Sequence, residues 1–178
     1  MNQNQEIMKA KIFSLLALAF FTFSCEKNEE ASLRVKMTDA PGDYQEVNID
    51  IEQVSAQIDA DDPNQSGWYD LPTNQGIYDL LEYQDTSSFE VAYDAALPVG
   101  VITELRFLLG DANTVLVDSV YYDLKTPSGQ QSGLKIKNVN IPDDGVELLI
   151  DFDVEASLHQ TGNGKYMLKP VLKVVDTL

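Results

Sequence analysis

Apolar residues alternate with polar ones from Leu33 onward, and this period-two pattern restricts the possible folds more than any other feature of the sequence. Leu33, Val35 and Met37 share one parity while Arg34 and Lys36 share the other, as in a strand with one buried and one wet face. No window of about eleven residues keeps a helical stripe of apolar positions. The sequence therefore predicts an all-β domain, a two-layer antiparallel β-sandwich of about eight to ten strands.

Two segments should depart from simple alternation. The apolar residues change parity between 47–51 and 54–58, so a bulge near Glu52 and Gln53 is expected to keep both sets on the core side. Residues 77–83 fit either a strand or a single helical turn.

Turns and faces can be assigned in the second half of the chain. Asp143-Asp144-Gly145 is typical of a hairpin, and it should join strands at 134–141 and 146–154. Within 101–109, alternation places Glu104 and Arg106 on one side of the strand and four residues together on the other: Thr103, Leu105, Phe107 and Leu109.

The first residues have the layout of a cleaved signal peptide. Lys9 and Lys11 precede an apolar run at 12–23, and the small Ser24 precedes Cys25. A permanent membrane span needs about 20 apolar residues, so this run is too short for one. Thr22-Phe23-Ser24-Cys25 resembles the lipobox of bacterial lipoproteins, which implies acylation of Cys25. The alternative is a signal peptide followed by an incidental cysteine.

The chain divides into a signal peptide at 1–24, an acidic tether at 25–32 and one domain at 33–178. Residues 26–30 (EKNEE) resemble the acidic export signal of Bacteroidetes surface lipoproteins, and a solvated linker is the alternative. The expected location is the outer membrane, as a lipoprotein that is periplasmic or surface-exposed and is held by its N-terminal lipid.

Charge and composition exclude several classes of function. The formal net charge of −17 would repel nucleic acid and anionic lipid surfaces. One cysteine excludes an intramolecular disulfide, and His159, the one histidine, argues against histidine-based metal centres. Residues 37–124 carry eighteen acidic side chains, and Arg106 is their single base.

Five segments together resemble the domain of unknown function 4382 family. The resemblance extends over about Leu33 to Val175. It rests on residues 38–44 (TDAPGDY), 105–107 (LRF), 124–135 (LKTPSGQQSGLK), 151–153 (DFD) and 166–171 (YMLKPV). It implies a β-rich extracytoplasmic domain, commonly part of a lipoprotein, with no established activity and no catalytic residue to transfer.

Two acidic segments are candidates for weak calcium binding; no other cofactor is expected. Asp39 and Asp43 flank a tight turn, where they should cap backbone amides or, with further oxygens, bind a divalent cation. The polar loop at 59–67 offers the oxygen ligands of Asp59, Asp61, Asp62 and Asn64 without the spacing of an EF-hand.

Two short patterns invite an enzymatic interpretation. Asp151 and Asp153 lie two apart on a predicted strand, and paired carboxylates can hydrolyse glycosides. Ile150 and Phe152 should face the core, however, so both aspartates should face solvent. A lysine from another strand could pair with them: Lys135, Lys137 or Lys169. Ser132 and Lys135 match a Ser-x-x-Lys pattern, but the context is a strand rather than a helix.

Aromatic pairs complete the set of candidates. Trp68-Tyr69 and Tyr121-Tyr122 must each place one ring on each face of a strand. The outward rings could bind a glycan or another surface protein. The expected function is therefore a tethered, non-enzymatic binding or surface-structural module. A cation-dependent adhesion or glycan-binding domain is the first alternative, and a carboxylate hydrolase is the second.

Overall fold

The computed structural model describes residues 30–39, 42–84, 86–126 and 131–178, so Cys25 and the signal peptide lie outside the described residues. The strands and helical turns follow one another along the chain: β1 (Glu30–Thr38), β2 (Glu46–Ala60), η1 (Pro63–Gln65), β3 (Gly67–Leu71), β4 (Gly76–Asp79), η2 (Leu80–Glu82), β5 (Phe89–Pro98), β6 (Gly100–Leu109), β7 (Thr114–Val117), β8 (Val120–Lys125), β9 (Gln131–Ile141), β10 (Val146–Phe152), α2 (Val154–Ser157), β11 (Leu158–Gln160), β12 (Tyr166–Leu168) and β13 (Leu172–Thr177).

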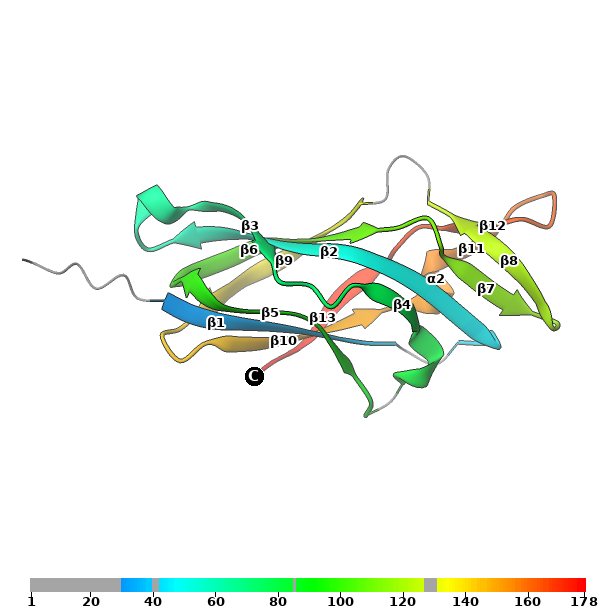
Figure 1. The fold of residues 1–178 in the computed structure, drawn as a ribbon, viewed down its shortest axis with the longest axis horizontal. Helices are drawn as coiled ribbons and strands as arrows, with labels where there is room; N and C mark the ends of the chain where they lie inside the picture. The colour runs from blue at the N-terminus through cyan, green and yellow to red at the C-terminus, as the bar shows by residue number, and fades with distance from the viewer. Residues whose placement is uncertain (1–29, 40–41, 85, 127–130) are drawn as a thin grey trace, which may run out of the picture.

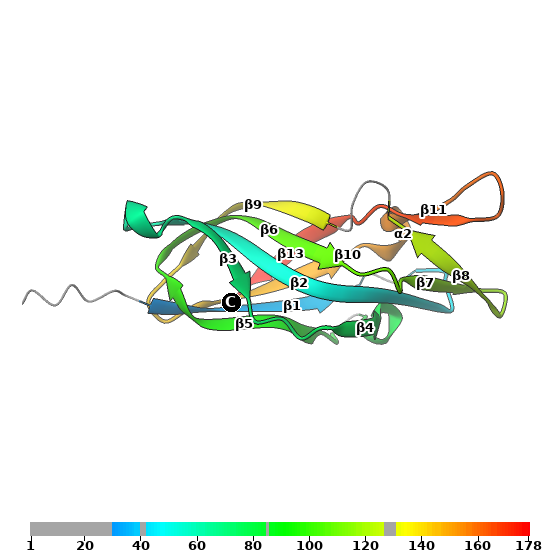
Figure 2. The same cartoon turned by 45° about the horizontal axis from the view of Figure 1, so that its top comes forward.

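The strands form two sheets that pack face to face, as Figures 1 and 2 show. One sheet has four strands in the order β13-β10-β1-β5. The other has nine, in the order β11-β12-β8-β7-β2-β6-β9, with β3 and β4 also paired to β2. The predicted all-β sandwich is confirmed. The described residues contain thirteen strands, and the β1–β10 and β12–β8 pairs are parallel.

The core lies between the two sheets and follows the predicted parity. Leu33, Val35 and Met37 of β1 are buried, whereas Arg34 and Lys36 between them are partly exposed. The side chains that face them from the other layer are equally apolar. They include Val54, Ala56 and Ile58 of β2 and Leu105, Phe107 and Leu109 of β6. At about 25 cal/mol per Å² of apolar surface, this burial is the main favourable term in folding.

The predicted bulge in β2 is confirmed. The β2–β6 register shifts between Ile51 and Gln53, so Ile51 and Val54 are both buried while Glu52 is exposed. The Gln53 side chain donates from Nε2 to the carbonyls of Val54 and Leu71, each at 2.8 Å. The bulge thus changes the parity of the strand and carries its own hydrogen bonds.

A second bulge, in β6, corrects one expected face. The pairing of β6 with β2 shifts between Gln57 and Ile58, which pair with Glu104 and Ile102 and leave Thr103 as the extra residue. Ile102 takes the core position, and Thr103 is only partly buried. Leu105, Phe107 and Leu109 point inward as expected. The expectation for Thr103 was wrong because strict alternation does not survive an inserted residue.

The expected hairpin at Asp143-Asp144-Gly145 was wrong as well. The strand before it pairs with β6 and the strand after it pairs with β1 and β13, so the turn passes from one sheet to the other. Gly145 has a φ of +89°, and a Cβ there would lie 2.7 Å from the backbone oxygen of Ser32. The corner is therefore packed against the start of β1 and suits only glycine.

Residues 77–83 contain both of the predicted alternatives. β4 ends at Asp79, whose Oδ1 accepts from the backbone amide of Leu81 at 3.1 Å and so caps η2. The same oxygen accepts from the amide of Val47 at 3.0 Å, which fixes the turn against β2. The ambiguous periodicity thus reflects a strand that ends in a helical turn.

Candidate functional site

Asp39 is the most deeply buried carboxylate among the candidates, with 3% of its surface exposed. Its Oδ1 accepts from the backbone amide of Val154 at 3.1 Å, and its Oδ2 accepts from Gln84 Nε2 at 3.4 Å. Its own amide donates to the Tyr83 carbonyl at 2.9 Å. Asp39 therefore joins the end of β1 to two distant segments instead of capping only its own turn, and Asp43 is exposed.

Burial raises the pKa of Asp39 from 3.8 to about 6. The hydrogen bonds from Val154 and Gln84 lower it, and the nearby charges of Asp151 and Asp153 raise it further. An acid in this setting is held part-way between its charged and neutral forms near pH 6.

Asp151 contradicts the expectation of a solvated pair, since only 9% of its surface is exposed. It lies on β10, an inner strand, between Thr38 of β1 and Lys173 of β13. A side chain on an inner strand is flanked on both sides, so its outward direction in the sheet does not guarantee contact with water. Ile150 and Phe152 are buried as predicted.

Asp153 follows the strand and begins α2. Its Oδ1 accepts from the amide of Ala156 at 2.9 Å, and its Oδ2 accepts from Lys173 Nζ at 2.7 Å. These contacts lower its pKa, with the Lys173 hydrogen bond as the main cause. The cation beside Asp153 is therefore Lys173, which the sequence had not suggested, since it had pointed to Lys135, Lys137 or Lys169.

The acidic loop at 59–64 uses its side chains to hold its own turn. Asp62 Oδ1 accepts from the Asn64 backbone amide at 3.0 Å and from its Nδ2 at 2.9 Å, which caps η1. Asp59 Oδ1 accepts from Ser66 Oγ at 3.4 Å, and Asp61 is exposed. Within the described ranges, no group of three or more acidic, histidine or cysteine side chains is placed to hold a metal ion.

Calcium binding stays a prediction that thermal melts can test. We expect millimolar calcium to raise the melting temperature modestly, because the acidic side chains of residues 37–124 repel one another on folding. The control is sodium chloride at matched ionic strength, and equal gains from both salts would indicate screening alone. A calcium-specific gain should be lost in the double variant Asp61→Asn, Asp62→Asn. If that variant keeps it, Asp39 and Asp43 are next to be tested.

Trp68 and Arg106 lie together on the outer face of the nine-stranded sheet. The guanidinium carbon of Arg106 lies 4.0 Å from the centre of the Trp68 ring, and 40% of the tryptophan surface is exposed. Glu104 Oε1 lies 3.7 Å from Arg106 Nη2. A cation held over an indole ring at this distance fixes its orientation. Sequence reasoning missed this pair, although Arg106 is the single base among eighteen acids.

The aromatic pairs divide between faces as predicted. Tyr69 packs against the core while Trp68 points outward. Tyr122 packs at 5.1 Å from Tyr166, and 57% of the Tyr121 surface is exposed. The Tyr121 hydroxyl donates to Glu46 Oε2 at 2.8 Å, so this outward ring is tied to an acidic neighbour.

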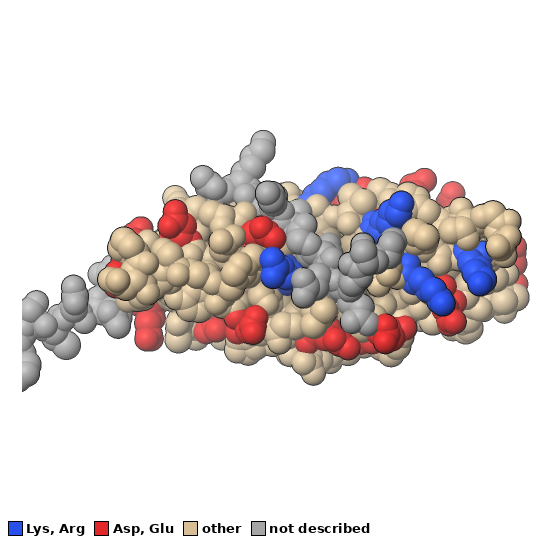
Figure 3. All heavy atoms as spheres, turned by 90° about the horizontal axis from the view of Figure 1, so that it is seen from above, with Lys and Arg blue, Asp and Glu red and all other residues tan. Residues whose placement is uncertain are grey.

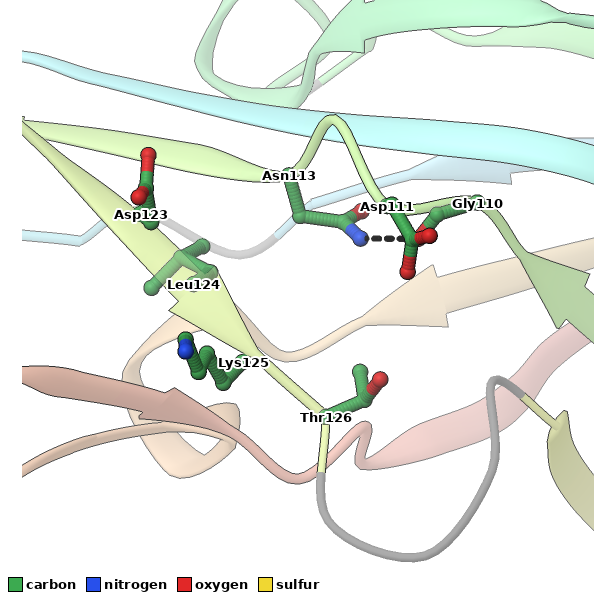
Figure 4. A pocket seen from close by; sticks show the side chains of 7 residues that line it. All are labelled: Gly110, Asp111, Asn113, Asp123, Leu124, Lys125 and Thr126. Carbon is green, nitrogen blue, oxygen red and sulfur yellow. Dashed lines mark hydrogen bonds between the residues drawn. The ribbon is translucent and has the colours of Figure 1, made fainter.

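A hollow of about 500 Å³ lies between the β6–β7 turn and the end of β8 (Figure 4). Asn113 holds the β6–β7 turn on one side of it, because its Nδ2 donates to the Gly110 carbonyl at 2.6 Å and its Oδ1 accepts from the Asp50 amide at 2.9 Å. Asp111, Asp123, Lys125 and Thr126 line the rest. The lining mixes both charges, so the hollow offers no strong preference for the charge of a ligand.

Charge is distributed unevenly over the surface. Figure 3 shows basic side chains gathered toward one end of the face that it displays, and acidic side chains along the lower edge. Lys125 on β8 and Lys165 and Lys169 beside β12 are exposed at that end. The opposite end, near β3 and η1, is formed by segments of residues 37–124, the range that carries eighteen acidic side chains and one base.

These features define an all-β sandwich domain that presents an aromatic and charged outer face. The chain belongs to the family described as Domain of unknown function (DUF4382), whose model matches residues 30–170. This match confirms the resemblance found in the sequence. No curated protein and no solved structure matches the chain.

Proposed function

We propose that this chain is a membrane-anchored extracytoplasmic lipoprotein whose sandwich domain is a non-enzymatic binding module. We further propose that it binds through the outer face formed by β3, β2 and β6. The observation that carries the proposal is the ring of Trp68, which Arg106 holds on an open face of the sheet. A fixed, partly exposed tryptophan supplies a large contact area and loses little conformational freedom on binding.

The roles of the carboxylates support binding over catalysis. Asp62, Asp79 and Asp153 each accept a backbone amide at the start of a helical turn. Asp39 accepts a hydrogen bond from the amide of Val154, and it does not line the hollow at Gly110. These side chains stabilise the fold, and a hydrolase would instead need an acid pair that substrate can reach.

The lipid anchor is the part of the proposal that rests on residues 1–25. In the described part of the chain, no helix has the length and apolar character needed to cross a bilayer. The layout of Lys9, Lys11, the apolar run and Cys25 supports attachment through an acylated cysteine.

We expect Cys25→Ala to leave the domain folded and to abolish its attachment to membranes, because acyl chains on this residue are the proposed anchor. Detergent phase partitioning of both forms measures the effect, and circular dichroism checks the fold. A substituted chain that still enters the detergent phase would contradict the lipoprotein assignment.

The binding face can be tested on isolated cell envelopes with the unanchored Cys25→Ala chain. We expect this chain to be retained, and we expect the added substitution Trp68→Ala to reduce the bound fraction about tenfold. Tyr121→Ala is the matched control, since it removes an exposed ring elsewhere. Retention that does not depend on Trp68 would overturn the proposed face.

A further inference from the structure

A second hollow, of about 330 Å³, adjoins the tryptophan on the same part of the sheet. Four of its six lining residues have polar side chains: Gln57, Asp59, Ser66 and Thr103, with Ile58 and Gly67 as the others. Gln57 and Trp68 are cross-strand partners in the β2–β3 pair, so their side chains share the outer face. The hollow and the aromatic ring therefore form one continuous surface.

The two irregular segments of this region shape the hollow. Thr103 is the extra residue of β6 in its pairing with β2, and its hydroxyl donates to the Gln57 carbonyl at 3.4 Å. Ser66 follows η1, and its Oγ accepts from the Ala60 amide at 3.0 Å. The capped turn and the bulge thus hold two hydroxyl groups in fixed positions beside the sheet.

The polar groups of the hollow match the chemistry of a sugar ring. A sugar presents hydroxyls that both donate and accept, and a face of C–H groups. The carboxylate of Asp59 accepts and the carboxamide of Gln57 does both. The hydroxyls of Ser66 and Thr103 donate to Asp59 and to the Gln57 carbonyl, and each oxygen keeps a lone pair that can accept from a sugar hydroxyl. Arg106 covers one face of the Trp68 ring, which leaves the opposite face for a ligand. The negative face of an indole ring attracts C–H groups, which suits the flat side of a sugar.

The acidic side chains near the hollow determine which sugars can bind there. Asp59 lines the hollow, Asp61 and Asp62 follow it in the adjoining turn, and Asp70 and Glu104 lie on β3 and β6. Arg106 is the one base on β2, β3 and β6, and it is engaged by Trp68 and Glu104. Uronic acids, sulfated sugars and phosphorylated sugars would be repelled by this field. The surface fits an uncharged ligand.

We infer that the hollow and Trp68 together bind a neutral carbohydrate, with one sugar unit packed on the indole and its hydroxyls paired with Gln57, Asp59 and Thr103. This inference rests on the proposed function and names its class of ligand. The site lies at the end of the sandwich where β1 begins, as Figure 1 shows. The neutral sugar could therefore belong to a free polysaccharide or to a glycolipid headgroup.

The test is binding of the full Cys25→Ala chain to a panel of neutral polysaccharides (glucan, mannan, galactan and xylan) and to vesicles with neutral glycolipids. Isothermal titration measures the affinity. We expect at least one neutral sugar to bind, and Trp68→Ala to weaken it about tenfold or more. Thr103→Val should weaken it several-fold because it removes only a hydroxyl. Tyr121→Ala should have no effect.

Each other outcome has a definite meaning. Equal melting temperatures for wild type and variants show that folding is intact, and Trp68→Phe should keep most of the affinity. Preference for an anionic polymer such as polygalacturonate, or sugar binding unchanged by Trp68→Ala, would overturn the inference. If no sugar binds while retention on envelopes still depends on Trp68, the carbohydrate class is wrong and the proposed binding face stands. If no sugar binds and retention on envelopes does not depend on Trp68, both the carbohydrate inference and the proposed binding face are wrong.

Discussion

We expect Phe152→Ala to lower the free energy of unfolding by about 3–5 kcal/mol. The side chain is 1% exposed and lies at the end of β10, a strand flanked by β1 and β13. Truncation removes a large apolar contact and leaves a cavity that close-packed neighbours fill only in part. Denaturant unfolding measures the loss as a lower midpoint at an unchanged slope.

Asp153→Asn is the matched comparison one residue further along the chain. Asparagine keeps the oxygen that caps α2 and loses only the charge that pairs with Lys173, a mostly exposed side chain. We expect a cost below about 1 kcal/mol. A larger effect at Asp153 than at Phe152 would show that the carboxylates, and not the apolar face of β10, determine the stability of this region. It would also restore weight to the hydrolase alternative.

Local patterns in the sequence predicted most of the strands. Parity alone placed Leu33, Val35 and Met37 in the core, and the change of parity after Ile51 located the bulge in β2. Both are predictable because side chains alternate along a strand and only one face of each sheet is buried. The same rule failed at Thr103, because Val101 and Ile102 before it are both apolar and the bulge in β6 gives no clear change of parity.

Pairing between distant strands could not be predicted in the same way. The turn at 143–145 has the composition of a hairpin, but Gly145 packs against Ser32, which is more than a hundred residues away in the sequence. The parallel pairing of β1 with β10 likewise depends on which strands meet across the sheet. Local composition determines where a chain turns, and tertiary packing determines which sheet it enters.

In the candidate site, too, local sequence predicts some features and tertiary packing determines the others. The outward direction of Trp68 follows from its pairing with Tyr69 in one strand, and the sequence predicted that one ring of the pair would be exposed. Its contact with Arg106 requires β3, β2 and β6 to be neighbours. The burial of Asp39 requires the amide of Val154, from a segment 115 residues further along the chain. No local pattern marks either contact.

We expect Asp39→Asn to raise the free energy of unfolding at pH 7 by about 1–3 kcal/mol and to change it little at pH 4. The pKa of Asp39 is about 6 in the folded chain, against 3.8 when the group is unperturbed. Stability associated with the protonated carboxyl is therefore fully present below about pH 4 and is lost as the pH rises through 6. Asparagine stays neutral, accepts from the Val154 amide and faces the Gln84 carboxamide, which can turn to present its oxygen.

Urea unfolding of both proteins at pH 4, 5, 6 and 7 isolates this contribution, because other titrating groups act on both alike. Asp153→Asn should behave in the opposite way. Its carboxylate has a lowered pKa in the folded chain, so it stabilises at neutral pH and this contribution is lost as the pH falls. If Asp39→Asn instead weakens the fold equally at every pH, the Val154 contact requires a carboxylate and burial does not govern its ionisation. Opposite slopes for the two variants would show that neighbouring aspartates differ in their effect because one is enclosed and the other is paired with Lys173.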